Sequence, residues 1–82
     1  MPRDSALLIV VPRETEVCIT NAGVVFAIDV IFAGADGTVI AVEREIPAGA
    51  TALRCHASVQ QVLETNAGVA AAVVAGDRML VD

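Results

Sequence analysis

The chain has 82 residues, which is the size of one small domain. Its net charge is −5, and all five of its basic residues are arginines that are scattered along the sequence. Because the chain has only two aromatic residues, it lacks both the basic stripe and the stacking platforms that nucleic-acid binding requires, and we expect neither a nucleic-acid partner nor binding to an anionic membrane surface.

The first part of the chain is predicted to contain two short strands. Residues 6–11 are continuously apolar and rich in β-branched side chains, which is typical of a strand that is buried on both faces. Pro12 begins a predicted turn over residues 12–15, because proline cannot donate a ladder hydrogen bond. A second β-branched strand is predicted over residues 17–20, followed by a turn at residues 21–23.

The strongest local signal is a β-hairpin around Asp36 and Gly37. An Asp-Gly pair between two apolar runs is typical of a tight turn, because both residues tolerate a positive φ. The flanking runs are residues 28–32 and residues 38–42. We expect the second strand to continue to Ile46, with alternating charges on a face that meets water.

The second half of the chain is more ambiguous. Residues 51–56 are expected to form a loop or a short extended segment. In residues 57–65 the apolar side chains follow the i, i+3, i+4 spacing of a helix, and the strand alternation is poor. The alanines of residues 69–74 favour one or two helical turns, and a final strand is predicted at residues 79–81.

Several segments occur in the order that is typical of a known prokaryotic family. The segments are Ile28-Asp29-Val30-Ile31-Phe32, Ala35-Asp36-Gly37-Thr38-Val39, Pro47, Val62-Leu63-Glu64, Ala67-Gly68 and Gly76-Asp77-Arg78. With them the chain resembles domain-of-unknown-function family 192, from Phe26 to the end, which is about three quarters of its length. The family contributes no established activity that could be carried over.

The resemblance implies a fold. It implies one domain over residues 1–82, all-β, built as a small antiparallel β-sandwich or barrel with one short helix near the C-terminus. It also implies that residues 59–64 are a strand, against the local helical spacing. We follow the resemblance here, because tertiary pairing often overrides propensity in short segments. Residues 69–74 then become the single helical turn.

One corner of the chain departs from the family pattern. The family usually carries a Met or Trp-Met followed by a basic residue ahead of its Asp, and a proline just before the Ile-Asp or Leu-Asp pair. Here Val24, Val25 and Ala27 occupy those places, so the polar and aromatic part of the corner is absent. Asn21 is matched to an Asn or Thr of the family and is therefore kept as a candidate binding residue.

Asp29 is the leading candidate for a functional residue. It interrupts the apolar segment of residues 24–32, and a carboxylate on a buried strand is costly unless it is paired or hydrogen-bonded. It could bind a ligand or act as an acid or base in a cleft. Alternatively, it could accept loop amides or pair with Arg54 or Arg78 and so hold the corner together.

Glu64 is the second candidate. If Glu64 and Asp29 faced one cavity, they could form a carboxylate pair of the hydrolase type. Alternatively, Glu64 is a solvated or arginine-paired residue at an edge. The candidate binding set is therefore Asp29, Glu64, Arg54 and Asn21, and no catalytic residue is predicted.

The cysteines give no cofactor signal. Cys18 and Cys55 lack the Cys-x-x-Cys spacing, and with one histidine they make no recognisable zinc site. Cys55 and His56 are adjacent, so in an extended segment their side chains point to opposite faces and cannot act as a nucleophile–base dyad. No phosphate-binding or nucleophile-elbow motif is present, so we expect neither a metal nor a cofactor.

The apolar runs also bear on location. The longest N-terminal run, residues 6–11, is too short for a membrane span or for the core of a signal peptide. A cytoplasmic location follows as the default, and free thiols are then expected rather than a disulfide. Whether Cys18 and Cys55 touch is left open.

The composition favours self-association. The chain is 56% hydrophobic with a mean hydropathy of +0.72, which is more than a small soluble monomer needs, so we expect a homo-oligomer. The alternative is that abundant alanine inflates the count without making apolar patches. Two functions remain open: a non-enzymatic binding or assembly module, and a small-molecule or carbohydrate binding domain or hydrolase that uses Asp29 and Glu64.

Overall fold

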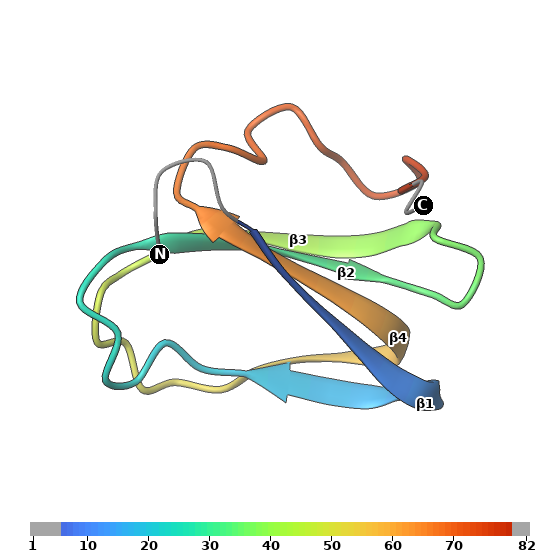
Figure 1. Ribbon diagram of the computed structural model, residues 1–82, viewed down its shortest axis with the longest axis horizontal. Helices are drawn as coiled ribbons and strands as arrows, with labels where there is room; N and C mark the ends of the chain where they lie inside the picture. The colour runs from blue at the N-terminus through green and yellow to red at the C-terminus, as the bar shows by residue number, and fades with distance from the viewer. Residues whose placement is uncertain (1–5, 80–82) are drawn as a thin grey trace.

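The computed structural model describes residues 6–79, which form one antiparallel sheet (Figure 1). Its four strands are β1 (Ala6–Ile19), β2 (Ile28–Ala33), β3 (Val39–Ile46) and β4 (Arg54–Asn66). The strand order is β1-β4-β2-β3, so β1 and β3 form the two edges. The predicted all-β class is confirmed, and the sheet is not closed into a barrel.

The predicted hairpin joins β2 to β3. The turn is closed by backbone hydrogen bonds from Gly37 to the carbonyl of Gly34 and from Gly34 to the carbonyl of Thr38. Gly37 has a φ of 86°, and a Cβ at this position would collide with the carbonyl oxygen of Met79. Glycine is therefore required here both by the turn and by the close approach of Met79.

β1 is one long bent strand rather than two strands and a turn. Its first half pairs with Gln61–Thr65 of β4, and its second half pairs with the beginning of β4. The register shifts between Val10 and Thr15, so the predicted turn at residues 12–15 is wrong and the segment is a bulge. A bulge bends a strand without ending it. In Figure 1 the second half of β1 consequently runs beneath β2 and β3.

β4 is one of the two inner strands of the sheet. It pairs with β1 on one side and with β2 on the other. The helix suggested by the local spacing of residues 57–65 is therefore not formed, and the strand implied by the family resemblance is confirmed. The backbone hydrogen bonds to two neighbouring strands stabilise β4 more than an isolated helix of only about two turns would be stabilised.

Residues 67–79, which we name the strap, cross one face of the sheet without forming a helix. Three successive turns are closed by hydrogen bonds from Val69 to Asn66, from Ala71 to Gly68 and from Val73 to Ala70. These i to i−3 bonds do not continue into an α-helical ladder, so the predicted helix at residues 69–74 is wrong. The predicted strand at residues 79–81 lies largely outside the described residues, which end at Met79.

The sheet buries side chains on both faces. On the first, which we name the core face, the bent sheet folds over a buried cluster. Its members are Ile28, Val30, Phe32, Ile46, Val59 and Val62. On the second, the strap face, Ile31, Val39 and Ala70 are buried beneath the strap. β2 serves both clusters because its side chains alternate between the faces, which explains why all six of its residues are buried.

The described residues contain no helix that is long and apolar enough to cross a membrane.

Candidate functional site

Asp29 is buried on the strap face and is fully hydrogen-bonded. Its side chain accepts three backbone amides: Oδ1 accepts that of Glu45 at 2.8 Å, and Oδ2 accepts those of Gly68 at 2.9 Å and Ala70 at 3.0 Å. Only 1% of the residue is exposed. Asp29 therefore joins β2 to β3 and to the strap. This is the structural role considered for Asp29 from the sequence, in which the carboxylate accepts loop amides.

Glu64 lies on the opposite face from Asp29. In the pairing of β2 with β4, Asp29 faces Thr65 and Val30 faces Glu64. Since consecutive side chains of a strand point to opposite faces, Asp29 belongs to the strap face and Glu64 to the core face. The two carboxylates therefore do not converge on one cavity, and a hydrolase-type pair has no geometric basis.

The side chain of Glu64 has no hydrogen-bond or ion-pair partner among residues 6–79. It is half-buried, lies opposite Leu7 of β1, and makes no hydrogen bond or ion pair with the described residues. Burial raises the pKa of its carboxyl group. The charged form of Glu64 therefore costs stability where it stands.

Arg54 and His56 both contact Glu43 on the core face, where all three side chains are partly exposed. The Arg54 guanidinium donates to Oε1 of Glu43 at 3.1 Å, and Nε2 of His56 lies 2.7 Å from Oε2. All three side chains are between 26 and 31% exposed. Although burial raises the pKa of Glu43, hydrogen bonds from His56 and Arg54 outweigh it and hold this pKa below its usual value.

This cluster was not predicted from the sequence. Glu43 was expected to face water, but it is half-buried beside the ring of His56, whose centroid lies 4.6 Å from that of Phe32. The available signal was the alternation of Arg54 and His56, which places both on one face once residues 54–66 are recognised as a strand.

Asn21 is a fully buried polar residue at one end of the sheet. Its Nδ2 donates to the carbonyls of Phe26 and Pro47, both at 3.0 Å, and more weakly to that of Ile46 at 3.4 Å. The loop before β2 and the loop after β3 are thereby held together. Its Oδ1 is buried without a hydrogen-bond partner among the described residues.

Cys18 and Cys55 form a disulfide between β1 and β4. The two residues are direct partners in the strand register, with their Cα atoms 4.0 Å apart. The expectation of free thiols is therefore wrong. The sequence could not show this, because the disulfide depends on the pairing of two strands that brings together cysteines 37 residues apart in the sequence.

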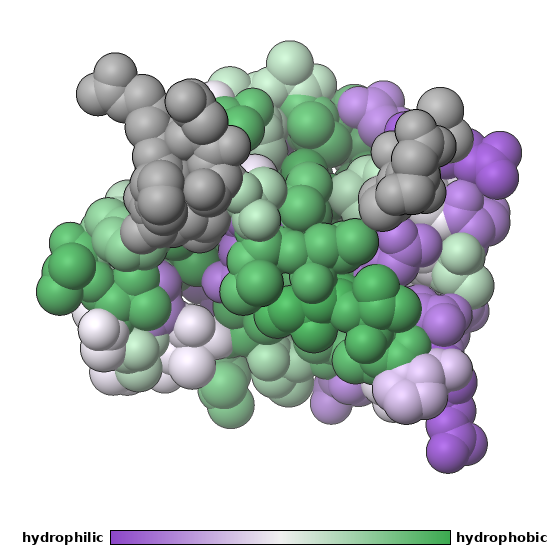
Figure 2. Space-filling model, in the orientation of Figure 1, coloured by the Kyte–Doolittle hydropathy of each residue, from purple (hydrophilic) through white to green (hydrophobic). Residues whose placement is uncertain are grey.

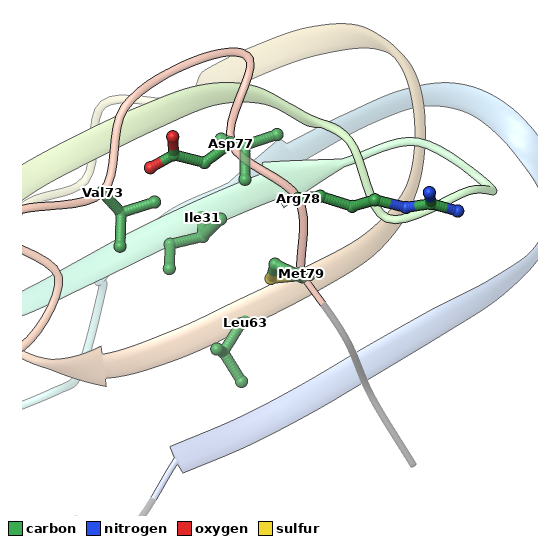
Figure 3. A pocket seen from close by; sticks show the side chains of 7 residues that line it. Ile31, Leu63, Val73, Asp77, Arg78 and Met79 are labelled. Atoms are coloured by element: carbon green, nitrogen blue, oxygen red, sulfur yellow. The ribbon is translucent and has the colours of Figure 1, made fainter.

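A cavity of about 510 Å³ lies between the strap face and the strap. Its lining residues are Ile31, Val39, Leu63, Val73, Asp77, Arg78 and Met79. In Figure 3 the Arg78 guanidinium extends away from the apolar side chains, and its Nε donates to the carbonyl of Asp36 at 3.0 Å. Asp77 accepts the amide of Val74 at 3.0 Å. Both charged residues that line the cavity are thus hydrogen-bonded to the backbone, and the other lining residues are apolar.

Apolar side chains also remain exposed. Figure 2 shows them gathered across the middle of one side of the molecule. On the edge strand β1, Leu7 is 53% exposed and Val10 is 60% exposed. The other large exposed apolar residues are Val25, Ile40, Leu53, Val69 and Val74.

No group of three or more His, Cys, Asp or Glu side chains is placed to hold a metal ion among residues 6–79. The convergence of Glu43 and His56 brings together only two such groups.

Two solved structures share this fold. One is a protein of unknown function from Novosphingobium aromaticivorans DSM 12444, with a TM-score of 0.87 and 20% identity over 95% of this chain and 58% of that chain. The other, from Sinorhizobium meliloti 1021, is described as a "putative transcription regulator" and has a TM-score of 0.87 and 26% identity over 95% of this chain and 63% of that chain. This chain therefore spans about three fifths of the length of either protein.

No curated protein matches the chain. A family with the description "Uncharacterized ACR" matches residues 1–81. The match extends the resemblance seen from Phe26 onward to nearly the whole sequence. The chain belongs to domain-of-unknown-function family 192.

Proposed function

We propose that this chain is a non-enzymatic binding or assembly module that functions as a homo-oligomer. The observation that carries the proposal is the exposure of Leu7 and Val10 on an edge strand, in a chain that is 56% hydrophobic. Exposed apolar strand edges are uncommon in monomers because they promote association.

The states of the charged side chains support a structural role. The Asp29 carboxylate accepts hydrogen bonds from three backbone amides, and the Glu43 carboxylate contacts Arg54 and His56. Acid–base catalysis needs groups that can reach a substrate and exchange protons with it. The candidate carboxylates Asp29 and Glu64 lie on opposite faces, which removes the basis for a two-carboxylate hydrolase.

The oligomeric state can be tested directly. Sedimentation velocity over a concentration series, with native mass spectrometry on the same sample, would report the number of subunits and any retained small molecule. A dimer or larger species without added mass supports the proposal. A monomer at every concentration contradicts it.

A second candidate function is the binding of a small apolar molecule in the cavity beneath the strap. The apolar lining from Ile31, Leu63, Val73 and Met79 favours it, since small-molecule sites are mostly apolar with few polar groups. Such a ligand would be hydrophobic rather than a carbohydrate, because a sugar requires convergent hydrogen-bonding groups.

The dye 1-anilinonaphthalene-8-sulfonate is a suitable probe for that cavity. Filling the cavity with Val73→Trp should abolish the dye's fluorescence enhancement. Val74→Trp is the matched control, because the neighbouring Val74 is 55% exposed and does not line the cavity. Equal enhancement with both variants would exclude the cavity as the binding site.

The cellular location stays a prediction. The sequence predicts a cytoplasmic location by default, but the disulfide between Cys18 and Cys55 favours an oxidising compartment, where such bonds persist. The description of the Sinorhizobium protein as a transcription regulator does not extend readily to DNA binding here, because five scattered arginines against ten acidic residues provide no phosphate-binding stripe.

A further inference from the structure

We propose that the free edge of β1 over residues 6–11 pairs antiparallel with the same edge of a second copy, joining the two sheets into one. This inference rests on the proposed function, since it names the surface through which the oligomer would form. The partner is a second copy of this chain.

The two edges of the sheet differ in what covers them. At the β3 edge, the Val39 amide donates to the carbonyl of Asp77 at 2.7 Å, and the Gly76 amide donates to the carbonyl of Val39 at 2.9 Å. The strap therefore occupies part of that edge. Among residues 6–79, the backbone pairing of residues 6–11 runs to β4 alone, which leaves their outer edge free.

Residues 6–11 of this edge lack the charged side chains and the proline that usually protect an edge strand from pairing. Edge strands of monomeric proteins commonly display charged side chains, a proline or a covering loop. Residues 6–11 contain no charge and no proline, and Pro12 follows only where the strand begins to bulge. Leu7 and Val10, which point to opposite faces, are both more than half exposed. An apolar strand of this kind is a template for another strand.

The register across the sheet shows what a second copy would continue. On the strap face, Leu8 of β1 pairs with Leu63, which pairs with Ile31, which pairs with Val42. This apolar row crosses all four strands and stops at the free edge. A two-fold axis perpendicular to the sheet keeps like faces together, so the Leu8 side of one copy meets the Leu8 side of the other and the row continues.

The absence of charge in residues 6–11 makes this apolar segment complementary to a second copy of itself. The chain carries a net charge of −5, so two copies repel each other over most approaches. Residues 6–11 are uncharged, and no like charges meet when they face themselves. Self-pairing of one strand about a two-fold axis also needs no second complementary surface, because the same segment provides both sides.

The test introduces lysines on the proposed edge. The variant Leu7→Lys/Val10→Lys should raise the dimer dissociation constant about tenfold or more in sedimentation velocity. The matched control is Val25→Lys/Leu53→Lys, because Val25 and Leu53 are 88% and 66% exposed but lie outside the strands. This control should associate like the wild type.

The outcomes separate the two proposals. If the wild type associates and the Leu7/Val10 variant associates equally well, the β1 edge is wrong while the proposed assembly function survives. If the wild type is monomeric at every concentration, the proposed function fails, and the edge pairing fails with it.

Hydrogen exchange of the wild type keeps the test decisive if the lysine variant fails to fold. Backbone amides of residues 6–11 should exchange more slowly as the protein concentration rises. Concentration-independent exchange in this stretch, combined with slowing elsewhere, would place the interface on another surface and overturn the inference.

Discussion

The carboxylate of Asp29 accepts the backbone amide of Ala70 at 3.0 Å, across 41 residues of sequence. Together with the amides of Gly68 and Glu45, this bond makes one side chain the junction of β2, β3 and the strap. The residue that most resembles a catalytic group in the sequence therefore stabilises the fold.

Replacing Asp29 with asparagine should lower the free energy of unfolding by about 2–4 kcal/mol, because an Nδ2 donor would face backbone donors. Urea denaturation followed by circular dichroism measures the change. Asp36→Asn is the control, since Asp36 is exposed and its side chain accepts the Thr38 amide within its own turn. If Asp29→Asn is as stable as the wild type, the junction assigned to Asp29 is not needed for folding.

Asn21→Ala should cost about 2–3 kcal/mol of stability. The change leaves the carbonyls of Phe26 and Pro47 without their donor in a part-buried site. Asn21→Asp should cost more, because a carboxylate would then face carbonyl oxygens. Thr20→Ala, which removes two exposed bonds, one donated to the Ala50 carbonyl and one accepted from the Ala22 amide, is the comparison and should cost less than either variant. Equal loss with all three would show that the buried amide has no special role.

The Glu43 cluster predicts a pH dependence of stability. The native pKa of Glu43 lies below its ordinary value, so its contribution is fully present above that ordinary value and is lost as the pH falls through the native pKa. Glu43→Gln should therefore reduce stability at neutral pH by about 0.5–1 kcal/mol, as expected for a partly exposed cluster. The difference from the wild type should vanish in acid.

Stability curves between neutral and acidic pH test this prediction. Glu16→Gln, an exposed substitution on β1, provides the control and should show no such pH-dependent difference. A constant deficit of Glu43→Gln at all pH values would mean that its charge is not what stabilises the cluster.

Reducing the disulfide between Cys18 and Cys55 should lower the free energy of unfolding by about 2–4 kcal/mol, since the bond closes a long loop of the unfolded chain. Thermal melts with and without a phosphine reductant measure the effect, and the Cys18→Ala/Cys55→Ala variant should melt like the reduced protein and ignore the reductant. Detection of two free thiols in the untreated folded protein would contradict the disulfide.

The sequence predicted those features that depend on neighbouring residues. The hairpin follows from Asp36 and Gly37, because the turn chemistry and both flanking strands lie within a few residues of each other. The all-β class follows from the family resemblance and from the β-branched runs. The apolar stretch at residues 6–11 was recognised as a strand, although burial on both faces was wrong: Leu7 and Val10 are exposed.

The features that the sequence did not predict depend on long-range pairing. Residues 57–65 have the apolar spacing of a helix but form a strand, because they pair with β1 and β2. The segment around Pro12 is a bulge, where the sequence predicts a turn. The disulfide and the Glu43 cluster both require the register of β4 against its neighbours. The same register separates Asp29 from Glu64, and no local pattern indicates to which face a carboxylate will point.

We propose that this domain acts by assembling through the apolar edge of β1. The most direct test is sedimentation velocity of the wild type and of the Leu7→Lys/Val10→Lys variant over the same concentration series. We predict a wild-type dimer or larger species that the two lysines return to monomer, while the Val25→Lys/Leu53→Lys control still associates. A wild type that sediments as a monomer at all concentrations would contradict the account.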